Sequence, residues 1–210
     1  MDFHFVHVYK LKPKGRRSMI LQLKNVRIAF CQNLFHPGTV TAADKPAYSA
    51  TFIIPKDDPQ IAKIKKAIIS VAEEKWEKKA EEVLKSLKIK DMLCLHDGDG
   101  KAQYDGFEGC MYISARNAAP PLVIDRDRTK LTENDGRPYA GCYVNCSLDI
   151  WAQDNNYGKR INAKLRGVQF FADGDAFVGS APASEDEFDD LSDTGENAGE
   201  SDDSAMADLI

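Results

Sequence analysis

The sequence lacks the features that mark membrane, secreted and metal-binding proteins. No apolar run approaches the roughly 18 to 20 residues that a helix needs to cross a bilayer. The first 18 residues carry five basic side chains but no apolar core of a secretory signal. The five cysteines are odd in number, and no two have the two-residue spacing of zinc knuckles or redox motifs. We therefore expect a cytoplasmic protein with reduced cysteines, no metal and no cofactor.

Basic residues are also missing from one end of the chain. Residues 185–210 contain 11 carboxylates and no Lys, Arg or His. The preceding residues hold all 28 basic side chains and 22 of the 33 acidic ones, so their net charge is about +6, against −5 for the whole chain. A positive body with a negative tail predicts a protein that binds a polyanion and competes with it through its own tail.

The tail ends in an apolar tip, residues 205–210, with the sequence Ala-Met-Ala-Asp-Leu-Ile. An apolar end after an acidic run is suited to docking on a partner protein. The tail residues to which we assign competition and docking are Asp202, Asp203, Asp208, Leu209 and Ile210.

The chain divides into three segments. Residues 1–18 form a basic N-terminal extension without a role in the fold, either a mobile arm or an upstream extension. Residues 19–180 are expected to form one domain, because a chain of this length with 43% hydrophobic residues buries one sizeable core. Residues 181–210 have the composition of a disordered acidic tail.

Alternation of apolar and polar residues predicts a mainly β protein. A phase change at Lys24-Asn25 indicates a bulge in the first strand. Asp58 and Pro59 begin an amphipathic helix whose apolar stripe continues to Leu87. One long helix after the second of five short antiparallel strands matches the order of a five-stranded OB barrel, with a small sandwich as the alternative. The predicted strands are residues 19–30, 48–54, 110–117, 142–152 and 159–171, with a short apolar run at 122–124.

The last two strands are predicted to form a hairpin with opposite faces of different chemistry. A two-residue turn at Asn155-Asn156 pairs Ile150 with Ile161 and gives one apolar face. The other face is basic with an aromatic residue near its end, because it carries Trp151, Arg160, Lys164 and Arg166.

Single-stranded nucleic acid offers phosphates that Lys and Arg neutralise and unstacked bases that lie on aromatic rings. Outward-facing strand positions supply both kinds of side chain. Alternatively, some of these aromatic residues cover a second hydrophobic layer. The candidates for phosphate contacts are Arg116, Arg160, Lys164 and Arg166, and those for base stacking are Tyr112, Tyr143 and Trp151, with Tyr157 as a further candidate.

A nuclease would need carboxylates grouped around a divalent metal. The available candidates are Asp97, Asp99 and Asp105, and they lie in a Gly-rich stretch that lacks EF-hand spacing and is typical of turns. We therefore expect no enzymatic activity.

Several segments resemble phage-encoded single-stranded DNA-binding proteins of the OB fold, over about residues 19–179. The resemblance implies a protein that coats and protects single-stranded DNA in phage DNA replication and recombination, and whose acidic tail recruits replication partners. The tip is Asp-Leu-Ile rather than an aromatic end, which leaves the partner open. The similar segments are ILQLKNVR at 20–27, YSATFIIP at 48–55, DGD at 97–99, YDGFEG at 104–109 and LRGVQFFADG at 165–174.

A strand-annealing recombination protein that oligomerises on DNA is the alternative, with the Lys-rich face of the helix as an assembly surface. Charge and stacking discriminate poorly among nucleic acids, so weaker binding of duplex DNA or RNA stays open, as does a homodimer.

Overall fold

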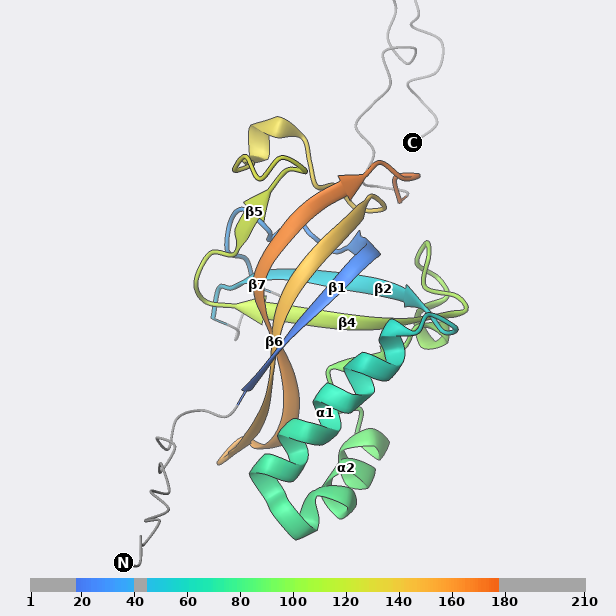
Figure 1. Ribbon diagram of the computed structural model, residues 1–210, viewed down its shortest axis with the longest axis vertical. Coiled ribbons are helices and arrows are strands. Elements are labelled where there is room, and N and C mark those ends of the chain that lie inside the picture. The colour runs from blue at the N-terminus through green and yellow to red at the C-terminus, as the bar shows by residue number, and fades with distance from the viewer. Residues whose placement is uncertain (1–17, 40–44, 178–210) are drawn as a thin grey trace, which may run out of the picture.

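The computed structural model describes residues 18–39 and 45–177, and a strongly curved β-sheet dominates it (Figure 1). The predicted acidic tail and nearly all of the predicted N-terminal extension lie outside these residues. Among the described helices, none is long and apolar enough to cross a membrane. The strands are β1 (Ser18–Ala29), β2 (Tyr48–Pro55), β3 (Leu95–Asp97), β4 (Cys110–Asn117), β5 (Leu122–Ile124), β6 (Tyr143–Asn155) and β7 (Gly158–Ala172).

The five long strands form a closed ring of pairings. β1 pairs with β2 and β6, β2 with β4, and β6 with β7, all antiparallel. The ring closes where β7 runs parallel to β4 through two pairs, Ala115 with Ala163 and Arg116 with Lys164. Two short strands pair with members of this ring: β3 with β4, antiparallel, and β5 with β7, parallel. The predicted mainly β fold is confirmed, and the strand order is that of an OB barrel.

The predicted bulge in the first strand is confirmed. The register of β1 against β6 shifts between Leu23 and Val26, and Asn25 adopts a φ of 52°. The Asn25 backbone N–H donates to Asn145 Oδ1 at 3.0 Å, which satisfies a donor that the interrupted ladder leaves over. The bulge lets both halves of β1 direct apolar side chains into the same barrel.

The expected helical segment is present but folds back on itself. Asp58 Oδ1 accepts a hydrogen bond from the backbone N–H of Gln60 at 2.7 Å, at the start of α1 (Gln60–Trp76). A 3-10 turn (Glu77–Lys79), in which Glu77 has a φ of 50°, separates α1 from α2 (Ala80–Ile89). The apolar stripe therefore covers two helices that pack against each other, and α1 also lies against β1 and β6 (Figure 1). Short 3-10 helices also occur at Gly98–Lys101 and Glu133–Asp135.

The β6–β7 hairpin has the predicted faces but a different register. Its turn lies at Asn156-Tyr157, because Asn155 pairs with Gly158, and Ile150 faces Ala163 instead of Ile161. Between Leu148 and Leu165 this shift of two residues keeps every side chain on the predicted face, since side chains alternate with a period of two. The hairpin extends beyond the barrel beside α1 (Figure 1), where Trp76 Nε1 donates to Asp154 Oδ2 at 2.8 Å.

The barrel encloses the main hydrophobic core, and a smaller cluster lies on its outer surface. Phe52, Ile113 and Leu148 are fully buried inside the barrel. The outer cluster contains Ala29, Ile53, Phe107 and Tyr112. The second hydrophobic layer considered for the aromatic residues therefore exists, and part of the loop between β3 and β4 covers it.

All five cysteines are free thiols, and Cys94, Cys142 and Cys146 are buried. Burial raises the pKa of the Cys31 thiol to about 11 and that of Cys142 to about 12. At neutral pH these side chains are therefore uncharged and act as small apolar residues.

Candidate nucleic-acid interface

A cleft of about 280 Å³ lies beside the two pairs that join β4 to β7. It brings together three predicted site residues from three strands: Arg116 of β4, Trp151 of β6 and Arg160 of β7. Ser114 and Asn162 also line it. We call this hollow the basic cleft. Two guanidinium groups, an indole and small polar side chains in one hollow can hold a phosphate and a flat ring together.

Lys164 lies next to the basic cleft but between charges of opposite sign. On one side its backbone partner is Arg116, and on the other it is Asp149. Asp149 Oδ1 is buried and has no hydrogen-bond partner among the described residues. Because this carboxylate offsets part of the positive charge of Lys164, we expect Lys164 to attract phosphate less strongly than the two arginines do.

The position of Trp151 depends on the observed hairpin register. Trp151 faces Asn162, while Arg160 faces Gln153 near the end of the hairpin. The Asn162 side-chain amide donates to Gln153 Oε1 at 3.3 Å, which links the two arms on this face. Trp151 and Arg160 therefore both reach the basic cleft without being direct cross-strand partners.

The other predicted residues lie elsewhere. Tyr112 is 7% exposed, so the prediction that it presents an open ring is wrong; Phe107 and His96 pack on it with ring centroids 5.2 and 5.0 Å away. Tyr143 lies at the opposite end of β6 from Trp151, with the Arg27 guanidinium 5.7 Å from its ring centroid. Arg166 is exposed at a bulge of β7. The ring of Tyr157, in the hairpin turn, is 88% exposed.

A second hollow, which we call the aromatic cleft, was not predicted. It has a volume of about 910 Å³, and Phe30, Tyr104 and Phe107 contribute rings to its lining. Tyr104 is 45% exposed and its ring meets that of Phe30 edge-on at 5.2 Å. Phe30 has a φ of 47°, which is unusual for a bulky residue and occurs mainly at sites where the surroundings impose it.

A cation connects the outer cluster to the aromatic cleft. Lys101 Nζ lies 4.8 Å from the ring centroid of Tyr112 and 5.7 Å from that of Phe30. His96, which stacks on Tyr112, also lines the basic cleft. A run of adjoining side chains thus leads from the basic cleft past Lys101 to Tyr104. Sequence reasoning missed Lys101 and Tyr104 because both lie in a loop without strand periodicity.

The acidic turn between β3 and β4 binds a lysine. Lys56 Nζ lies 2.8 Å from Asp97 Oδ1 and also contacts Asp99, and these hydrogen bonds lower the pKa of both carboxyl groups. Asp97 also accepts from the backbone N–H of Asp99, as expected for a turn. Within the described part of the chain no three His, Cys, Asp or Glu side chains are grouped as ligands for a metal ion.

Comparison with known proteins gives consistent matches. The family model of the single-stranded DNA-binding protein of Enterobacter phage Enc34 matches residues 19–200. Protein p50 of Acyrthosiphon pisum secondary endosymbiont phage 1 is 49% identical over 177 residues, which cover 83% of this chain and 95% of that protein.

Two solved structures share the fold. The single-stranded DNA-binding protein from bacteriophage Enc34 in complex with ssDNA is 31% identical with a TM-score of 0.63, over 75% of this chain and 88% of that one. The single-stranded DNA-binding protein gp2.5 of bacteriophage T7 matches with a TM-score of 0.52 at 12% identity, over 89% of this chain and all of that one, and shows the likeness of fold alone. The match to the family model over most of the sequence shows that this chain belongs to the family of the phage Enc34 single-stranded DNA-binding protein.

Proposed function

We propose that this protein binds single-stranded DNA without regard to sequence, and coats and protects it during phage DNA replication and recombination in the host cytoplasm. The observation that carries this proposal is the basic cleft, where Arg116, Arg160 and Trp151 converge from three strands. Membership of a family whose namesake is a single-stranded DNA-binding protein supports it.

The proposed DNA path continues from the basic cleft along the outer surface of β4. Ser114 is exposed on this surface, and its hydroxyl oxygen lies 2.9 Å from that of the buried Thr51 of β2. Lys101 then offers a cation above the covered ring of Tyr112, and Tyr104 offers an exposed ring at the aromatic cleft. A path with cations and rings in alternation suits a backbone that carries phosphates and bases in alternation. Tyr112 supports this path from below and does not stack on a base.

The acidic tail is proposed to compete with DNA for the basic cleft and to dock replication partners. Its 11 carboxylates and the phosphates of DNA are both polyanionic ligands for Arg116 and Arg160. With such competition, a long DNA strand would displace the tail from the basic cleft more readily than single, weakly bound anions would.

The test is a salt titration of oligo-dT binding with full-length protein and with protein lacking residues 185–210. Removal of the tail should tighten binding, and log affinity should fall with log salt by about 0.7 per phosphate neutralised. If neither protein binds oligo-dT at low salt, the proposed function is rejected. Duplex DNA and RNA of the same length serve as competitors that establish ligand preference.

A further inference from the structure

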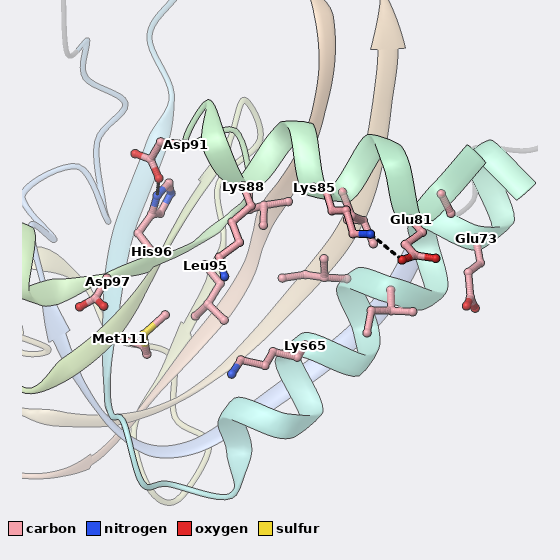
Figure 2. A pocket seen from close by; sticks show the side chains of 15 residues that line it. Lys65, Glu73, Glu81, Lys85, Lys88, Asp91, Leu95, His96, Asp97 and Met111 are labelled. Atoms are coloured by element: carbon pink, nitrogen blue, oxygen red, sulfur yellow. Dashed lines mark hydrogen bonds and ion pairs between the residues drawn. The ribbon is translucent and has the colours of Figure 1, made fainter. Parts of the chain in front are cut away.

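An apolar groove between α1 and α2 has no part in the DNA path proposed above. It has a volume of about 840 Å³, with walls from both helices and a floor that includes Leu95 and Met111 (Figure 2). Leu93 also belongs to its lining. Ile69 on the α1 wall is 46% exposed, and Leu84 on the α2 wall is half-buried. We call this hollow the α1–α2 groove. An open apolar surface of this kind is a place where another apolar segment can bind.

Most acidic side chains along the α1–α2 groove already have cationic or imidazole partners. Lys85 contacts Glu81 at 2.7 Å, His96 contacts Asp91 at 2.7 Å, and Lys56 contacts Asp97 at 2.8 Å. The remaining charged groups of its lining are Glu73, Lys65 and Lys88.

Two of those remaining charges are cations that lie next to apolar surface. Lys65 from α1 and Lys88 from α2 extend from opposite walls on the side of Leu95, while Glu73 lies at the far end (Figure 2). Neither lysine has an ion pair within the described part of the chain. An apolar peptide that carries a single carboxylate suits this surface, because the carboxylate can lie between the two lysines and away from the acidic groups of the lining.

We infer that the apolar tip of this chain, residues 205–210, docks in the α1–α2 groove. Met206, Leu209 and Ile210 supply apolar side chains for the floor, and Asp208 supplies one carboxylate for the two lysines. This inference rests on the proposed competition between tail and DNA, and it identifies what holds the tail in place. Attachment to the same chain raises the effective concentration of the tip, so a weak contact suffices.

The chain length permits the contact. Residues 178–204 form a connection of 27 residues between the described domain and the tip. Such a segment spans at most about 90 Å when extended and about 30 Å on average as a flexible chain. A domain of this size has a radius of gyration of about 15 Å, so the tip can reach any of its faces.

Docking of the tip would place the acidic part of the tail at the basic cleft. The α1–α2 groove and the basic cleft adjoin, since Asp91, Leu93 and His96 line both. Asp202 and Asp203 precede Leu209 by six or seven residues, a reach of about 20 Å. A tip held among the helices thus keeps these two carboxylates close to Arg116 and Arg160.

The experiment compares oligo-dT affinity of full-length variants at fixed salt. Leu209→Ser with Ile210→Ser removes the anchor without changing the charge of the tail, and Ile69→Glu blocks the groove at an exposed position. Both should tighten binding by at least about threefold, because the carboxylates lose local concentration at the cleft. Ile89→Glu is the matched control and should have no effect, since Ile89 is 86% exposed on α2 and lies outside the groove.

A direct measurement uses a labelled peptide of residues 201–210 and protein that lacks residues 185–210. The peptide should bind this protein and fail to bind its Ile69→Glu form. If removal of the tail tightens DNA binding but the tip and Ile69 variants do not, the docking inference is overturned while the proposed competition stands. If removal of the tail has no effect on DNA binding, the competition is rejected, and peptide binding alone decides whether the α1–α2 groove takes the tip.

Discussion

Arg116 of β4 and Lys164 of β7 are direct partners in the two-residue parallel contact that closes the barrel. Adjacent strands are about 4.8 Å apart, so the contact that completes the fold also sets two cations side by side on the outer surface. Asp149, on the other side of Lys164, offsets part of this charge, and an anion bound beside Arg116 would offset more of it. The feature that completes the fold is thus also a reason for this surface to attract phosphate.

Replacement of the cleft arginines should weaken DNA binding and reduce its dependence on salt. Arg116→Ala and Arg160→Ala should each lower the slope of log affinity against log salt by about 0.7, because each removes about one phosphate contact. Lys63→Ala, on the exposed face of α1 and outside the cleft, should leave the slope unchanged. If the two arginine variants gave the same slope of log affinity against log salt as the lysine variant, the proposed site would be contradicted.

Trp151 should report directly on stacking. Trp76 is the other tryptophan of the chain, so in a Trp76→Phe background the tryptophan fluorescence, excited selectively over that of tyrosine, belongs to Trp151 alone. Oligo-dT should quench this fluorescence, and Trp151→Ala should cost about 1 to 3 kcal/mol of binding free energy. Trp151→Phe should retain part of that energy, because a smaller ring still stacks. Unquenched fluorescence at saturating DNA would exclude the indole from the interface.

Tyr112 and Tyr104 should respond to truncation in opposite ways. Tyr112→Ala removes a buried ring and should lower the free energy of unfolding by about 3 kcal/mol, whereas Tyr112→Phe keeps the ring and should change DNA binding little. Tyr104→Ala should leave thermal stability nearly unchanged and weaken oligo-dT binding, because that ring is 45% exposed beside Lys101. Thermal unfolding and binding isotherms on the same samples separate the two effects.

The cluster of Lys56, Asp97 and Asp99 should contribute stability over a defined pH range. Hydrogen bonds from Lys56 lower the pKa of both carboxyl groups from 3.8, so their contribution is present above pH 3.8 and is lost as pH falls through the lowered values. The same contacts raise the pKa of Lys56 from 10.5, so its contribution persists below pH 10.5 and is lost as pH rises through the raised value.

The corresponding variant is Lys56→Met. Its melting temperature should lie below that of the unchanged protein by a constant amount between about pH 5 and pH 9, and the two curves should converge in acid. Lys63→Met, which lacks these partners, provides the control. A difference that persists unchanged at pH 2, where both carboxyl groups are protonated, would show that it does not come from the ionised forms of Asp97 and Asp99.

Much of the architecture follows from local patterns in the sequence. The bulge at Lys24-Asn25 could be predicted because the apolar positions change parity there. The turn of the last hairpin was placed one residue too early, yet the faces of Trp151 and Arg160 were correct, since a register shift of two preserves alternation. The face of the sheet on which a side chain lies is therefore easier to predict than the residue with which it pairs.

The remaining features depend on contacts distant in sequence. Nothing in the pattern around Tyr112 shows that Phe107 and His96 cover it, because these neighbours lie in a loop without periodicity. The apolar pattern continues through Glu77 without a break, so the pattern alone predicted one helix. The structure has a turn at Glu77 and two helices. Lys101 and Tyr104 acquire their positions only when that loop folds onto the barrel.

The part of the β6–β7 hairpin that extends beyond the barrel can change length without disturbing the enclosed core. Two extra residues in each arm would preserve the alternation of faces and lengthen the outer surface by about 7 Å, which is close to the spacing of one extended nucleotide. If DNA follows the proposed path, the number of nucleotides covered by each molecule would therefore depend on hairpin length, which is where protein engineering would change it.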